Sequence, residues 1–146
     1  MKPINEAKLT FPSRSANEGF ARTAAACFAA QLDPTLDEVN DIKTAVSEAV
    51  TNCIVLAYPD RLGVVALRMR LFPDNVIEVT VKDTGVGIPD VDKARTPLYT
   101  TGGGDRSGMG FTIMESFMDA VKVRSVPGKG TTVTLRRRIS ARMGRV

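Results

Sequence analysis

The segment Asp83-Thr84-Gly85-Val86-Gly87 combines a short acidic residue with two glycines in one turn. It follows a run of alternating apolar and polar residues over 77–81, which is typical of a strand. Glycines at a strand end allow a ligand to approach bare backbone. An ionised aspartate held by the turn can only accept hydrogen bonds, so it suits a ligand's amino group. The same pattern also fits an ordinary surface loop.

Glu48 and Asn52 are a second candidate pair, because they lie four positions apart in a segment with helical periodicity. Residues with this spacing share one face of a helix, and that face lies off the apolar stripe. A carboxylate there could accept a proton, and the neighbouring amide oxygen could hold a hard cation such as Mg²⁺. A solvated helix face would show the same two residues.

Gly108-Met109-Gly110 opens a predicted helix after a glycine-rich stretch over 96–107 that lacks periodicity and indicates a mobile loop. A helix N-terminus offers unpaired N–H groups and a positive dipole end, which favour phosphate. The Walker pattern Gly-x-x-x-x-Gly-Lys-Ser/Thr is absent from the sequence, so an ordinary P-loop is excluded.

The elements that must position these residues follow from periodicity, capping boxes and breakers. In chain order we expect a strand over 8–11, a helix from a capping box at Ser15 to about Leu32, a second helix from a capping box at Thr35 to Pro59, strands over 65–71 and 77–81, a helical turn over 92–95, a helix over 109–118, and a closing hairpin of 121–123 with 133–135.

The well-patterned strands are apolar on one side only, whereas a doubly wound parallel sheet would bury both faces. We therefore predict a two-layer α/β sandwich, with helices on one face of a mixed, mostly antiparallel sheet. The 146 residues fit one domain spanning 1–146, with a basic tail over about 139–146 that we expect to be solvated or frayed.

Composition narrows the possible functions. The chain contains no histidine, which removes metal–imidazole sites, Ser-His-Asp triads and any phosphohistidine. The net charge of +4 includes five arginines in the last eleven residues, so the body is close to neutral and nucleic acid is not expected as a direct partner.

Without a bilayer-length apolar run or a signal-peptide pattern, we expect no membrane association and a cytoplasmic location. Cys27 and Cys53 are expected to be buried free thiols.

The order of these motifs resembles the Bergerat-type ATP-binding fold shared by gyrase B, the heat-shock protein 90 chaperone, histidine kinases and MutL. Within that superfamily, the stretches 30–35, 47–52 and 106–115 resemble the compact serine kinases that act as sporulation anti-sigma F factors. The resemblance covers nearly the whole chain. It departs at Leu56-Ala57, where relatives often have histidine and glycine, and at 101–105, where they carry a lysine–proline–acid run.

The resemblance implies a homodimer that binds and inhibits sigma factor F and phosphorylates a serine of an anti-anti-sigma partner, using ATP and Mg²⁺. It implies Glu48 as general base, Asn52 as Mg²⁺ ligand and Asp83 as the residue that reads adenine. The other implied ligand contacts are Gly85 and Gly87 beside the adenine, Thr132 near Asp83, Ser107, Gly108 and Gly110 at the phosphates, and Arg106 in the lid.

We place the sigma-binding surface around Arg14, Glu18 and Arg22, by the same resemblance and because these charges lie on and just before an otherwise alanine-rich helix. Two alternatives stay open. The same fold could act on the general-stress sigma factor, or it could hold nucleotide and sigma factor without transferring phosphate.

Overall fold

The computed structural model describes residues 1–95 and 110–140. Its elements, in chain order, are β1 (Asn5–Pro12), α1 (Ala16–Ala29) with the 3₁₀ turn η1 (Ala30–Leu32), α2 (Leu36–Asn52) with the π-helical turn η2 (Cys53–Ala57), β2 (Val64–Phe72), β3 (Val76–Asp83), α3 (Val91–Ala94), α4 (Gly110–Phe117), β4 (Ala120–Val126) and β5 (Gly130–Arg138). No helix in this part of the chain is long and apolar enough to cross a membrane.

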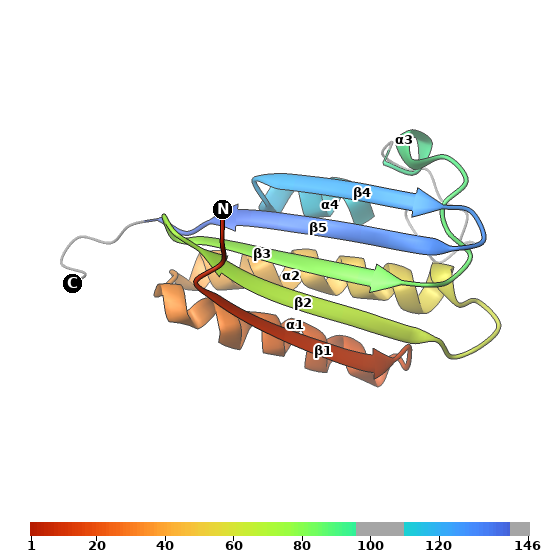
Figure 1. Ribbon diagram of the computed structural model, residues 1–146, viewed down its shortest axis with the longest axis horizontal. Helices are drawn as coiled ribbons and strands as arrows, with labels where there is room; N and C mark the ends of the chain where they lie inside the picture. The colour runs from red at the N-terminus through yellow and green to blue at the C-terminus, as the bar shows by residue number, and fades with distance from the viewer. Residues whose placement is uncertain (96–109, 141–146) are drawn as a thin grey trace.

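The strands form a sheet in the order β1-β2-β3-β5-β4, and each neighbouring pair is antiparallel. Helices α1, α2 and α4 lie together on one face of this sheet (Figure 1). The predicted two-layer α/β sandwich is therefore confirmed. The strands are longer than expected because polar residues such as Arg124 and Arg136 occupy their outward positions and interrupt the apolar pattern without interrupting the ladder.

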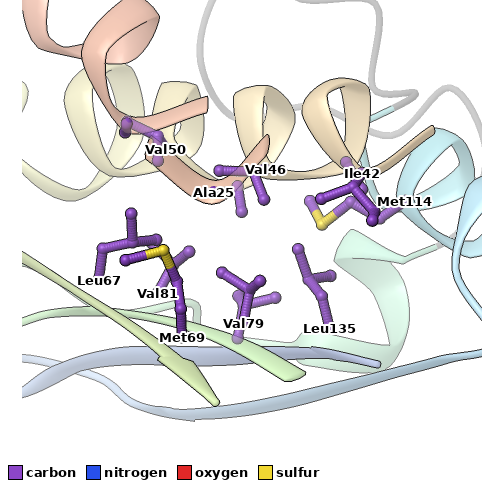
Figure 2. Close-up of a cluster of buried hydrophobic side chains, with 14 of the residues drawn as sticks. Ala25, Ile42, Val46, Val50, Leu67, Met69, Val79, Val81, Met114 and Leu135 are labelled. Atoms are coloured by element: carbon purple, nitrogen blue, oxygen red, sulfur yellow. The ribbon is translucent and has the colours of Figure 1, made fainter. Parts of the chain in front are cut away.

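The core lies between the helices and the inward side of the sheet (Figure 2). Most cross-strand partners on that side are apolar, as in the row Met69, Val79 and Leu135. Ile42 and Val46 of α2 are fully buried above them. Each large aliphatic side chain removed from water in this way contributes about 1.5–3 kcal/mol. This core holds α2 against the strand whose end carries Asp83.

The helix starts differ from one another. At Thr35 the predicted capping box is present, with Glu38 N–H donating to Thr35 Oγ1 at 3.1 Å and Thr35 N–H donating to Glu38 Oε1 at 2.9 Å. At Ser15 the predicted box is wrong. Ser15 has a helical backbone conformation, so its side chain makes no capping hydrogen bond, and Glu18 instead pairs with Arg22.

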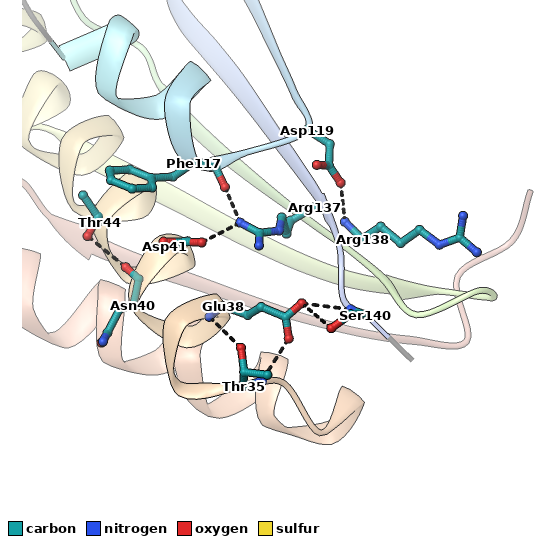
Figure 3. A network of polar contacts seen from close by, with 10 residues as sticks. All are labelled: Thr35, Glu38, Asn40, Asp41, Thr44, Phe117, Asp119, Arg137, Arg138 and Ser140. Carbon is teal, nitrogen blue, oxygen red and sulfur yellow. Dashed lines mark hydrogen bonds and ion pairs between the residues drawn. The ribbon is translucent and has the colours of Figure 1, made fainter. Parts of the chain in front are cut away.

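A polar network joins the C-terminal end of β5 to the helices (Figure 3). Glu38 Oε2 accepts hydrogen bonds from the backbone N–H and the hydroxyl of Ser140, at 2.9 and 3.0 Å. Arg137 donates to Asp41 of α2 and to the carbonyl of Phe117, which ends α4. Residues 139 and 140 therefore do not belong to a frayed tail as predicted: Ile139 is buried and Ser140 is anchored. Residues 141–146 lie outside the described residues.

Candidate functional site

Asp83 is the last residue of β3 and is only 5% exposed, so its carboxylate needs hydrogen-bond donors. Its Oδ1 accepts the backbone N–H of Gly85 at 3.0 Å and that of Thr131 at 3.2 Å. Its Oδ2 accepts the thiol of Cys53 at 3.4 Å. The two oxygens are thus held from three different segments of the chain, and Asp83 is far more constrained than a surface turn residue.

The π-helical turn η2 brings the motif of α2 to this aspartate. Cys53 directly follows Asn52, and the wider π turn places both Cys53 and Ala57 in the buried core. The carbonyl of Ala57 then accepts the backbone N–H of Val86 at 3.0 Å. Two motifs that are 31 positions apart in the sequence, at Asn52 and Asp83, therefore meet through this turn.

The side chain of Tyr58 is hydrogen bonded to the turn that follows Asp83. Its hydroxyl accepts the backbone N–H of Thr84 at 2.8 Å and donates to the carbonyl of Val64 at 2.7 Å. A side chain at Gly63 would collide with the Tyr58 ring, since an added Cβ would lie 2.2 Å from it. The sequence pattern did not identify Tyr58 as part of the site, because its partners lie at the start of β2 and in the turn after β3.

The glycines of the turn are required by close backbone packing. A Cβ on Gly85 would lie 2.2 Å from the carbonyl oxygen of Ala57. Gly87 has a φ of 77°, which is strained for other residues, and an added Cβ would lie 2.5 Å from the carbonyl oxygen of Val126. The turn is therefore pressed between η2 and the β4–β5 hairpin.

Glu48 and Asn52 are both half-buried on α2, while Ala49 and Val50 between them are buried. The prediction that the pair lies off the buried stripe is confirmed. Among residues 1–95 and 110–140, no three His, Cys, Asp or Glu side chains cluster to hold a metal ion. Mg²⁺ would fit here only with few protein oxygens, which agrees with its preference for water and substrate phosphates.

The threonine beside Asp83 is Thr131, and the prediction of Thr132 is wrong by one position. Thr131 pairs with Asp83 across the ladder, on the side that faces the helices, and its hydroxyl lies 2.8 Å from Ser125 Oγ. Thr132 pairs with Lys82 and points to the opposite side of the sheet. A strand reverses its facing direction at every residue, so a register error of one moves the side chain away from the site.

Cys53 is a further residue of the site that sequence reasoning missed, beside Tyr58 and Thr131. It was assigned to the core, correctly, and it is 4% exposed and free of any disulfide. Burial raises the pKa of the Cys53 thiol well above its ordinary value, and the negative charge and hydrogen bond of Asp83 act in the same direction. The thiol therefore stays protonated and donates. Cys27, also expected to be buried, is exposed instead, because its position on α1 faces away from the sheet.

The remaining candidates fall into two groups. Gly110 is the first residue of α4, whereas Arg106, Ser107 and Gly108 lie outside the described residues, as does the expected mobile loop over 96–107. Near the start of α1, Arg14 is exposed, and Arg22 pairs with Glu18 at 3.2 Å. Glu18 Oε2 is buried and has no hydrogen-bond partner among the described residues.

The structure combines an antiparallel sheet and one layer of helices with a buried aspartate at a strand end and a Glu-x-x-x-Asn helix. This combination defines a class of nucleotide-binding protein. The family of histidine kinase-like ATPase domains matches residues 11–137. Among solved structures, the RsbU and RsbW domains of a Mycobacterium tuberculosis protein match with a TM-score of 0.71 and 19% identity, covering 96% of this chain and 34% of that one. The histidine kinase domain of a blue-light activated kinase from Erythrobacter litoralis matches with a TM-score of 0.57 and 24% identity, over 84% and 61% of the two chains.

Comparison of sequences identifies the family more narrowly than comparison of structures. The anti-sigma F factor of Caldanaerobacter subterraneus is 54% identical over 92% of this chain and 94% of its own length. The anti-sigma F factor of Geobacillus stearothermophilus is 56% identical over 91% and 92%. This chain therefore belongs to the histidine kinase-like ATPase domain family and, within it, to the anti-sigma F factor family.

Proposed function

We propose that this protein is an anti-sigma factor that binds ATP or ADP, captures sigma factor F as a homodimer, and phosphorylates a serine of an anti-anti-sigma partner. The arrangement around Asp83 carries the nucleotide part of this function. A buried carboxylate stands at a strand end, fixed by Gly85 and Thr131 and joined through Cys53 to the Glu-x-x-x-Asn helix. It suits the exocyclic amino group of adenine, which offers the matching donor.

The same geometry supports the following proposed roles around the base and the phosphates. Asp83 would accept the amino group, with Gly85 and Gly87 bordering the ring where a side chain cannot fit. Gly110 at the start of α4 would face the phosphates, together with Ser107, Gly108 and Arg106 of the neighbouring segment. This set departs from the sequence-based one only in that Thr131 takes the place of Thr132.

Asn52 would provide the protein oxygen for Mg²⁺, which neutralises phosphate charge when it is bound. Glu48, one turn earlier on α2, would accept the proton of the attacking serine hydroxyl. The chain has no histidine that could take this role. The proposed sigma-binding surface, at Arg14, Glu18 and Arg22, lies at the start of α1, which is a different helix from the one that carries Glu48.

Three variants test the nucleotide and kinase parts separately. Asp83→Asn exchanges an acceptor oxygen for a donor amide, so ADP binding measured by calorimetry should be lost. Asn52→Ala should weaken nucleotide binding only when Mg²⁺ is present. Glu48→Gln keeps the shape of the side chain and should still bind ATP and sigma factor F, but phosphoryl transfer should fall about 10²- to 10⁴-fold.

The outcomes separate the alternatives. Phosphorylation of the anti-anti-sigma partner at wild-type rate by Glu48→Gln protein would remove Glu48 as the base. If the wild-type protein binds ADP and sigma factor F but transfers no phosphate, it is a nucleotide-dependent binding module. Capture of the general-stress sigma factor in preference to sigma factor F would support the other alternative. Unchanged ADP affinity in Asp83→Asn protein would reduce Asp83 to a turn residue.

A further inference from the structure

We propose that Cys53 is a positioning residue for adenine recognition, whose thiol holds Oδ2 of Asp83 in the orientation that accepts the amino group of the base. This role rests on the nucleotide binding proposed above and extends it to a residue that would not touch the nucleotide itself. The Sγ–Oδ2 distance is 3.4 Å, and both residues are at most 5% exposed.

The need for such a donor follows from how the carboxylate is held. The backbone N–H groups of Gly85 and Thr131 both donate to Oδ1 and none of the hydrogen bonds described for Oδ2 comes from backbone. Two donors fix the position of Oδ1, but they leave Oδ2 free to swing as the carboxylate rotates. The thiol of Cys53 adds a contact to Oδ2, so the plane of the carboxylate is set before a ligand binds. Preorganisation of this kind reduces the ordering cost of binding.

A thiol suits this position for two reasons. It is a weak donor, so it orients Oδ2 without competing strongly with the amino group for the electron density of that oxygen. It also behaves as a small apolar group, which is compatible with its burial in the core beside Ala57.

The π turn explains how this residue reaches the aspartate. Cys53 is its first residue, directly after Asn52, and a one-residue change in the turn would move the thiol off the sheet side. The same segment therefore carries both the proposed Mg²⁺ ligand and the group that orients the adenine reader. The base end and the phosphate end of a nucleotide would be coupled through two consecutive residues.

The test compares ADP with inosine diphosphate, which has a carbonyl in place of the exocyclic amino group. The dissociation constant for inosine diphosphate divided by that for ADP, in wild-type protein, measures how much the amino group contributes to binding. Cys53→Ala should reduce ADP affinity about threefold to tenfold and leave inosine diphosphate affinity nearly unchanged, so the ratio should fall by the same factor. Cys53→Ser restores a donor of similar size and should restore the ratio.

Val50→Ala is the matched control, because Val50 is a fully buried residue one turn earlier on α2 and its truncation also opens a cavity. Any effect of lost packing should appear in this variant for both nucleotides alike. An equal loss of affinity for the two nucleotides in Cys53→Ala protein, or no loss at all, would show that Cys53 only fills the core. If wild-type protein binds neither nucleotide, the proposed function fails first.

A measurement without nucleotide tests the contact directly. The S–H stretching band of Cys53, obtained by Raman difference between wild-type and Cys53→Ala protein, should lie at the low frequency of a donating thiol. It should move to higher frequency in Asp83→Ala protein, where the acceptor is removed. A band at the free-thiol frequency in wild-type protein would overturn the role of Cys53.

Discussion

Glu38 and Ser140 are hydrogen bonded to each other although 102 positions separate them in the chain. The carboxylate of Glu38 thus closes the capping box of α2 with one oxygen and holds the end of β5 with the other. Burial alone would raise the pKa of Glu38, but the hydrogen bonds from Ser140 and Thr35 outweigh it and the net shift is downward. A single side chain therefore joins the helix layer to the C-terminal strand.

Replacing Glu38 by Gln should cost about 1–3 kcal/mol of the free energy of unfolding at pH 7, because charge-assisted hydrogen bonds become neutral ones. A depressed folded-state pKa stabilises the protein above the unfolded pKa, and this stability is lost as the pH falls through the folded value. The difference between wild type and Glu38→Gln should therefore shrink below about pH 4. Urea denaturation from pH 3 to pH 8 measures it, and a gap that widens towards low pH would contradict the role given to Glu38.

Gly85→Ala should abolish nucleotide binding and destabilise the fold by about 1–3 kcal/mol, because its Cβ would collide with the carbonyl oxygen of Ala57. Gly128→Ala is the control. Gly128 has a positive φ of 80°, unlike Gly85, and nothing lies within 4 Å of its added Cβ. It should lose about 1 kcal/mol of stability from backbone strain and keep its affinity for ADP. Equal losses of ADP affinity in both variants would point to loop strain and away from the close approach at Gly85.

The two cysteines should differ sharply in reactivity. Cys27 is exposed and should react with a thiol reagent at the rate of an ordinary surface cysteine. Cys53 is buried and its pKa is raised, so its labelling in native protein should be about 10³-fold slower or more and should follow unfolding. Mass spectrometry of timed samples counts the labels, and Cys27→Ser protein isolates the slow site. Rapid modification of Cys53 in native protein would mean that the η2 region opens.

Charge reversal at Arg22 should weaken capture of sigma factor F by tenfold or more while leaving ADP affinity unchanged, since α1 carries none of the proposed nucleotide contacts. Arg22 forms an ion pair with Glu18 at 3.2 Å, so Arg22→Glu also places two carboxylates together. The double variant Glu18→Arg/Arg22→Glu restores the ion pair with the two charges exchanged. It therefore distinguishes a loss of protein stability from a loss of sigma-factor recognition. Lys8→Glu, on the outward side of β1, is the control for net charge. Unchanged capture in the Arg22 variant would place the surface elsewhere.

Much of the fold could be predicted from the sequence, because the patterns that indicate helices and strands are local. The period of 3.6 across α2, the one-sided alternation of β2 and β3 and the capping box at Thr35 each depend on residues within a few positions of one another. Glu48, Asn52 and Asp83 were also chosen as candidates in this way, because a short spacing or a strand end with glycines marks each of them. The Ser15 box was wrong for the same reason, since a local motif does not report the backbone conformation that tertiary packing selects.

The surroundings of Asp83 come from tertiary packing. Its donors Cys53, Gly85 and Thr131 lie 30, 2 and 48 positions away, and only the closest belongs to the local motif. Whether Thr131 or Thr132 faces the aspartate depends on the register between β3 and β5, which adjacent threonines leave undetermined in the sequence. The thiol reaches Oδ2 because α2 ends in a π turn packed on the sheet, and that turn is set by the core beneath it.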